Sequence, residues 1–203
     1  MSGTIPGGSS ALGPQAAVLQ RLIAERKTVQ DYRQGTLPEG ALTRALELAS
    51  AAPNHRMTEP WRFVQVGPQG RQALFEIAAH LKSAPGAPLA GPARDRLAAK
   101  MLVPNELLVI CQTTAEDPEV AREDYAAVAC AVYATMLSLW SEGVGSKWST
   151  GGVTTDERTY GCLGVDPSQQ TIVGFLWVGF DARAEAPKPR RRRPLDQILR
   201  SIP

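Results

Sequence analysis

The sequence predicts an α+β domain in which helices flank a small sheet. Amphipathic helical patterns alternate irregularly with short apolar runs rich in β-branched and aromatic residues. One segment, 125–140, is apolar on nearly every side and predicts a helix buried all round. The length of 203 residues fits one domain. We expect that domain to span 15–203, after a disordered extension over 1–14 rich in Gly, Ser and Pro.

The first half of the chain predicts helices around one strand. Thr36 and Glu39 match a capping box, so the helix that follows should begin there and stop before Pro53. The Ala, Pro and Gly content of 83–92 predicts a loop. The other expected elements are a helix over 15–26, a strand over 61–66, a helix over 70–82 and a short helix over 94–101.

The second half is organised around the long helix. Asp117 and Pro118 form a helix start, and the pattern continues to Glu142, where Gly143 and Gly145 end it. The other expected elements are a strand over 107–111, a short strand or turn over 148–152, a short helix over 154–163, a strand over 171–179, a loop over 181–189 and a last helix or strand over 195–202.

Bulk properties exclude several classes of protein. The net charge of +2 is too balanced to indicate a nucleic-acid partner. The run 125–140 is short for a membrane span, and no signal peptide is apparent, so we expect a cytoplasmic protein without a membrane partner. Three distant cysteines without a CxxC argue against disulfides and zinc, and Cys111 and Cys130 are expected to be buried thiols. Of the two histidines, His80 is expected to be solvated.

Side chains suited to binding gather in the loop over 52–63. It carries His55, Arg56 and Trp61 between a helical and a strand pattern, where a plain connector would use small polar residues. The segment 146–152 adds hydroxyls and glycines that permit close approach of the backbone to a ligand, although Trp148 alone fits a core residue better. Both segments are candidate binding loops.

Two basic segments have two interpretations each. The first segment, Arg26 to Thr28, follows a helix end. Its two cations either stabilise the helix dipole or, together with the Thr28 hydroxyl, form an anion site. The arginines at 190–193 are a solvated charge run or a phosphate site. The residues alone leave both alternatives open.

Four motifs occur in order along nearly the whole folded chain from Leu19. They are Arg26-Lys27-Thr28-Val29, then Ala52-Pro53-Asn54-His55 with Glu59-Pro60-Trp61-Arg62-Phe63, then Glu142-Gly143-Val144-Gly145 with Lys147-Trp148-Ser149-Thr150-Gly151, and finally the strand 171–179 before a basic Arg-Pro-Leu tail. Together they resemble the nitroreductase family of FMN-dependent oxidoreductases, and most closely its minimal, short members.

The resemblance implies a mainly antiparallel sheet flanked by helices and an intertwined homodimer, with FMN between the subunits. It places these residues at the cofactor: Arg26, Lys27, Thr28, Asn54, His55, Glu59, Trp148, Ser149, Thr150, Gly151, Arg191, Arg192 and Arg193. Lys27 would lie near the N1–C2=O edge of the flavin, and Glu59 would approach from the partner subunit. Arginines of the tail would hold the phosphate.

The implied activity is ping-pong electron transfer. NADH or NADPH would reduce FMN by hydride transfer to N5, and a nitroaromatic, quinone or similar electrophile would then be reduced. The segment 83–100 would form a lid over the site. Alternatives are a flavin-binding or regulatory module, and a dehalogenase-like or flavin-destructase-like branch of the family.

Two departures from the family pattern bear on the flavin's redox properties. Glu59 stands where the family commonly has Gln, and a carboxylate there would disfavour negative charge on the reduced ring. Lys27 and Thr28 stand for Arg and Ser, which keeps the charge and the hydroxyl but loses the bidentate guanidinium fork.

Overall fold

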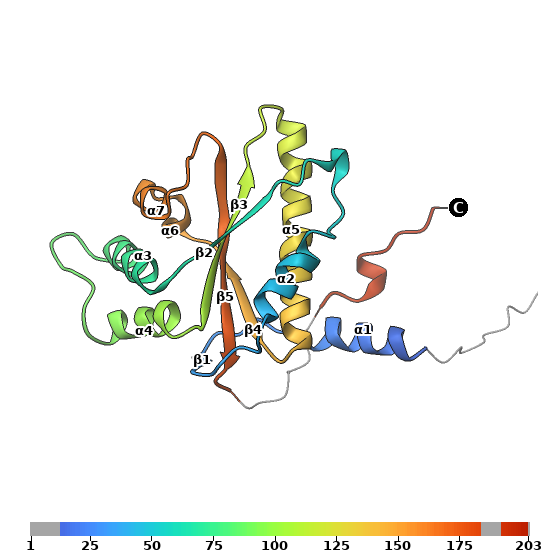
Figure 1. Ribbon diagram of the computed structural model, residues 1–203, viewed down its shortest axis with the longest axis horizontal. Helices are drawn as coiled ribbons and strands as arrows, with labels where there is room; N and C mark the ends of the chain where they lie inside the picture. The colour runs from blue at the N-terminus through green and yellow to red at the C-terminus, as the bar shows by residue number, and fades with distance from the viewer. Residues whose placement is uncertain (1–12, 184–191, 203) are drawn as a thin grey trace, which may run out of the picture.

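A five-stranded sheet forms the centre of the molecule (Figure 1). The computed structural model describes residues 13–183 and 192–202. The strands are β1 (Tyr32–Arg33), β2 (Trp61–Gln65), β3 (Glu106–Thr113), β4 (Gly145–Ser149) and β5 (Gln170–Asp181). The order is β1-β5-β3-β2, β4 also pairs with β5, and every one of these pairs is antiparallel. The predicted α+β class with a mainly antiparallel sheet is confirmed.

The two central strands are apolar because helices cover both of their faces. Along β3 and β5 successive side chains point to opposite sides. Leu107 and Phe175 belong to one core, whereas Leu108 and Leu176 belong to the other. Both strands are therefore buried along most of their length.

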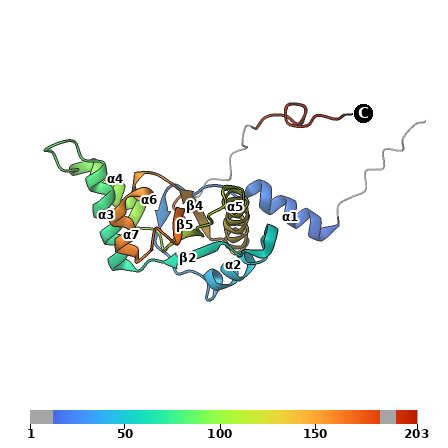
Figure 2. The same ribbon diagram turned by 90° about the horizontal axis from the view of Figure 1, so that it is seen from above.

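The helices form two layers (Figure 2). On one side of the sheet lie α3 (Pro68–Leu81), α4 (Gly91–Leu102), α6 (Gly152–Thr155) and α7 (Glu157–Leu163). On the other side lie α2 (Ala41–Ala49) and α5 (Pro118–Ser141), with α1 (Pro14–Glu25) beyond them. Two 3-10 turns, η1 (His55–Met57) and η2 (Leu195–Gln197), complete the described elements. No helix within 13–183 or 192–202 has the length and apolar character needed to cross a membrane.

Helix α5 begins where its sequence predicts but is covered on one side only. The Asp117 side chain accepts a hydrogen bond from the Glu119 amide at 2.8 Å, and Gly143, at φ 77°, follows the helix end. Val128 and Val132 are fully buried against the sheet, whereas Tyr133 is 41% exposed. A single chain therefore does not bury this helix all round.

The two cysteine predictions separate on this helix. Cys111 in β3 is buried, and burial raises the pKa of its thiol to about 11. Cys130 on α5 is exposed, so the prediction of a buried thiol is wrong for Cys130 in the single chain. The reason is that Cys130 belongs to the uncovered side of α5.

Several predicted boundaries are wrong. The capping box does not form: α2 begins at Ala41, after Gly40 at φ 70°, and no side chain caps it. The helix expected over 154–163 is broken at Asp156, whose carboxylate caps a second helix by accepting from the Arg158 amide. The last segment forms only the short turn η2. The predicted extension over 1–14 lies outside the described residues except for its last two, and Pro14 already begins α1.

Candidate functional site

The first basic motif runs alongside β4. The Val29 amide donates to the Ser146 carbonyl at 3.1 Å, and Thr28 forms a parallel bridge with Ser146. Lys27 pairs with Asp181 at the end of β5, with Nζ 2.6 Å from a carboxylate oxygen. The structure therefore brings together two segments that the sequence singled out, 26–28 and 146–152, which lie more than a hundred residues apart.

Alternation along β4 sends neighbouring side chains to opposite faces of the sheet. Ser149 faces α3 and α4, and its Oγ accepts the indole N–H of Trp177 at 2.9 Å. Trp148 instead packs with the core on the α5 side. Gly151 adopts φ 143°, where a side chain would be strained, and a Cβ there would meet open space. The backbone after β4 is thus accessible to a ligand.

A cavity of about 380 Å³ lies between α3, α4 and β4. Phe175 and Trp177 line it from β5, and Ser149 and Thr150 add hydroxyls. Its basic lining residues are Lys82, Arg96, Lys100 and Lys147. No Asp or Glu is among its described lining residues. The cavity is suited to a partly aromatic, anionic ligand.

Lys147 is the most enclosed of these cations. Burial lowers the pKa of Lys147, and the nearby charge of Lys100 lowers it further, while Asp31 acts in the opposite direction. Its Nζ donates to Gln30 Oε1 at 2.9 Å. An anion bound beside Lys100 and Lys147 would relieve their mutual repulsion.

None of these four cations is among the residues that the sequence predicted at the site. The signals were present: Arg96 and Lys100 are four residues apart on one face of α4, and Lys147 shares its face of β4 with Ser149. Neither signal shows that α4 and β4 face one another, which depends on the tertiary fold.

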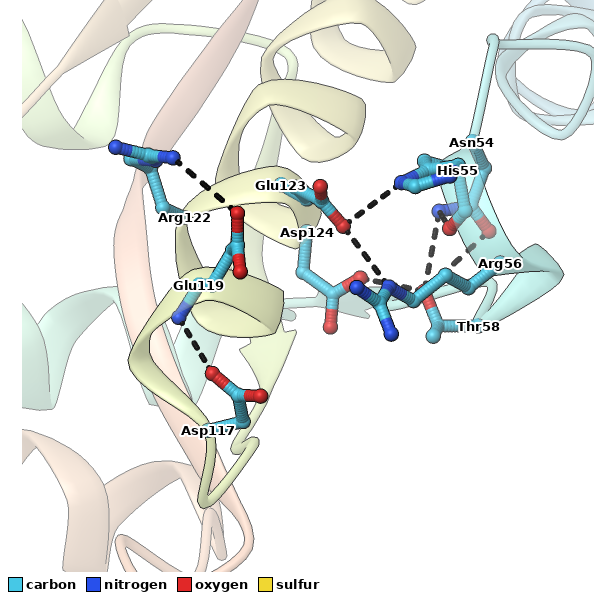
Figure 3. Close-up of polar contacts among 9 residues, drawn as sticks. All are labelled: Asn54, His55, Arg56, Thr58, Asp117, Glu119, Arg122, Glu123 and Asp124. Carbon is cyan, nitrogen blue, oxygen red and sulfur yellow. Dashed lines mark hydrogen bonds and ion pairs between the residues drawn. The ribbon is translucent and has the colours of Figure 1, made fainter.

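The loop after α2 is held rigidly against the start of α5 (Figure 3). Asn54 Oδ1 accepts the Glu59 amide at 2.6 Å, so the side chain ties the two ends of the loop together. The Thr58 hydroxyl donates to Asp124 on α5 at 2.5 Å. His55 Nδ1 and Arg56 Nε both lie near Glu123 Oε2, at 2.9 Å and 3.1 Å.

This loop is also strained. Arg56, Met57 and Glu59 have φ values of 66°, 52° and 44°, in the left-handed region that residues other than glycine rarely adopt. The hydrogen bond from His55, together with that from Arg56, lowers the pKa of Glu123 despite partial burial, so this anchor carries negative charge at neutral pH. Strain maintained by such anchors is typical of functional loops.

The loop and the basic cavity lie apart within one chain. In Figure 1, η1 lies beside the first turns of α5, whereas α1, which leads into Arg26, lies beside its last turns. From Glu123 to Ser141 the helix rises about 27 Å. Asn54, His55 and Glu59 are therefore not assembled with 26–28 and 149–151 in a single chain.

The side of α5 that the chain leaves uncovered forms an apolar hollow. A space of about 730 Å³ lies between α1, α2 and α5, and Leu22, Leu48 and Tyr133 are among its lining residues. Ala52 and Pro53, which begin the candidate loop, line it too. Val18, Leu19 and Ile23 of α1 are exposed nearby.

The remaining predicted site residues are in the C-terminal tail. Arg192 and Arg193 are exposed. Arg191 lies outside the described residues.

The chain is similar to several known proteins along most of its length. YfhC of Bacillus subtilis, provisionally named an NAD(P)H nitroreductase, is 27% identical over 183 residues, covering 89% of this chain and 92% of YfhC. A nitroreductase-like family protein from Bacillus cereus is 26% identical with a TM-score of 0.75, over 91% of this chain and 95% of that chain. A protein from Desulfovibrio desulfuricans solved in complex with FMN shares the fold, at 19% identity and a TM-score of 0.68, over 95% of this chain and 98% of that chain.

The family model of the nitroreductase family matches residues 23–180, which include the first three motifs and β5 as far as Phe180. The resemblance seen in the sequence is thereby confirmed. This chain belongs to the nitroreductase family.

Proposed function

We propose that this protein is an FMN-dependent NAD(P)H oxidoreductase that acts as a homodimer. Its second substrate is a nitroaromatic, a quinone or a similar electrophile, reduced in a second half-reaction. One observation carries the proposal: the motif 26–29 is hydrogen-bonded to β4 beside the basic cavity. Family membership and the names of the relatives give it further support.

The residues around the cavity fit FMN chemically. Aromatic side chains offer apolar contact, hydroxyls offer hydrogen bonds, and cations without lining carboxylates suit a phosphate or a reduced, negatively charged ring. The open backbone at Gly151 permits close approach. When bound, FMN accepts two electrons from the nicotinamide and passes them to the electrophile.

The chain's own residues would bind and orient the cofactor. We assign this task to Arg26, Lys27, Thr28, Ser149, Thr150 and Gly151, with Arg191, Arg192 and Arg193 at the phosphate. Trp148 would support β4 from the α5 core. Lys27 already forms an ion pair with Asp181, which partly neutralises its charge. We therefore add Lys147 and Lys100 as cations beside the ring.

The second subunit would supply the other half of the site. Because Asn54 holds the Glu59 amide, the loop acts as one unit, and we infer that Asn54, His55 and Glu59 together serve the cofactor of the opposite subunit. The apolar hollow along α1, α2 and α5 continues into Ala52 and Pro53. A second copy covering that hollow would carry the loop toward the other subunit's cavity.

Purification and reduction test the proposal. The protein should be yellow or take up FMN, bleach with NADH or NADPH, and turn over with a nitroaromatic. Arg26→Ala should weaken FMN binding about 10- to 100-fold, because a charge-assisted contact is lost. His80→Ala, an exposed control on α3, should leave it unchanged.

Three outcomes would contradict the proposal. A protein that binds no FMN is not a flavoenzyme, and equal effects of the Arg26 and His80 substitutions would refute the site. Colour without bleaching would indicate a flavin-binding module instead of a reductase.

A further inference from the structure

The outer rim of the basic cavity carries two cations that the proposed FMN site does not use. Lys82 lies at the end of α3, and Arg96 lies on the first half of α4. Both line the cavity and both are exposed, in contrast to the half-buried Lys147 on the far wall. The rim cations belong to the helical layer, and Lys147 belongs to the sheet.

Carboxylates neutralise many cations of this protein but not these two. Arg94, two residues before Arg96 on the same helix, has its guanidinium 2.6 Å from Glu76 and stacked over the Phe75 ring. Arg44 and Arg158 are likewise paired with acidic residues. Within the described residues, neither Lys82 nor Arg96 forms an ion pair.

Helix geometry accounts for only part of this arrangement. A cation at Lys82 is favoured by the C-terminal dipole of α3. No such effect applies to Arg96, which lies near the middle of α4, one turn before Lys100 on the same face. The positive charge on the cavity side of α4 is therefore unexplained by the helix itself.

We propose that Lys82 and Arg96 form a subsite for an anionic group, a phosphate or a carboxylate, on the small molecule that meets the flavin. The inference rests on the proposed function, because it concerns a second ligand that enters the cavity when FMN already occupies part of it. The guanidinium of Arg96 offers a bidentate fork and Lys82 a mobile point charge. The anionic group has two sources: the 2′-phosphate of NADPH, which NADH lacks, or an acidic group on the electron acceptor.

The test compares wild type with the double variant Lys82→Ala/Arg96→Ala, both loaded with FMN. For the donor, we expect KM for NADPH to rise about tenfold and KM for NADH to stay unchanged, since only NADPH carries the extra phosphate. Independently of turnover, calorimetry should show that 2′,5′-ADP binds the wild type more tightly than 5′-AMP, and that the double variant loses this difference. High salt should reduce it as well.

The acceptor arm uses 4-nitrobenzoate and nitrobenzene. If the anionic group belongs to the acceptor, the KM for 4-nitrobenzoate rises in the double variant, while the KM values for NADPH, NADH and nitrobenzene stay the same. This result would also support the subsite. Arg122→Ala, which removes an exposed cation on α5 away from the cavity, is the matched control and should change nothing.

Two results would overturn the inference. Weaker FMN binding by the double variant would mean that the rim cations hold the cofactor, and unchanged discrimination in both arms would mean that they are merely solvated. Neither result resembles failure of the proposed function, because a wild-type protein that binds no FMN or oxidises no NADH fails before the variants are compared.

Discussion

Gly174, in the middle of β5, lies directly against the indole of Trp148. A Cβ at this position would lie 2.4 Å from Trp148 Nε1 and 2.9 Å from the Ser149 carbonyl oxygen. The second contact is with backbone, so β4 itself would have to move. We expect Gly174→Ala to lower the free energy of unfolding by about 1–3 kcal/mol, as overpacking commonly does, measured by urea denaturation.

Gly161 is the matched control for that substitution. It lies within α7, and a Cβ there would meet nothing within 4 Å. Gly161→Ala should leave stability unchanged or raise it by about 0.5–1 kcal/mol, because alanine favours a helix. Equal effects of the two substitutions would show that the contact between β4 and β5 is looser than the structure indicates.

The loop between α2 and β2 stores strain that a substitution can measure. Met57 has φ 52°, and its side chain is 77% exposed, so truncating it removes little packing. Glycine adopts this conformation freely, whereas alanine bears a cost of about 1–2 kcal/mol. Met57→Gly should therefore be more stable than Met57→Ala by about 1 kcal/mol, which reverses the usual effect of glycine.

Chemical denaturation of both Met57 variants at one pH gives the comparison directly. An alanine variant as stable as the glycine variant would mean that the loop relaxes, and that Asn54 and the contacts to Asp124 and Glu123 do not hold it in this conformation. A relaxed loop would present Asn54, His55 and Glu59 less rigidly to a second subunit.

For the molecule as a whole, the uncovered side of α5 predicts a dimer. Tyr133 is 41% exposed and lines the apolar hollow. A carboxylate there would be buried without a partner in the proposed interface, at a cost of several kcal/mol. Light scattering should show the wild type at twice the chain mass of 21.8 kDa and the Tyr133→Asp variant at the mass of one chain. The variant should also lose its FMN.

Arg122→Asp, on the same helix but outside the lining of the apolar hollow, should remain dimeric and keep its FMN. A wild-type protein that runs as a 21.8 kDa monomer with FMN bound would refute the two-subunit site. It would also require the loop over 52–63 to have a different role.

Local signals predicted those features that neighbouring residues control. Asp117 and Pro118 specify the start of α5, because the cap and the proline act within one turn. The capping box at Thr36 and Glu39 failed for a related reason. Gly40 in the left-handed conformation redirects the chain just before Ala41, and the turn from Pro38 to Ala41 replaces the expected first helical turn.

The residues alone indicated the segments of the candidate site, and their arrangement around a cofactor was implied only by the family resemblance. Arg26 to Thr28 and Ser149 to Gly151 were identified by motif, and the fold joins them through β4. The cations of α3 and α4 were missed, because a lysine or arginine on a helix looks the same whether it faces solvent or a cavity. Their role depends on which surface lies opposite.

The family, the α+β class and the motif residues could all be identified from the sequence, because they depend on local pattern and spacing. The assembled fold was needed to show that Trp148 faces the core beneath α5, that Cys130 is exposed in one chain, and that four cations share one cavity. Burial and electrostatic pairing depend on segments far apart in sequence, and these segments meet only when the sheet and its two helical layers assemble.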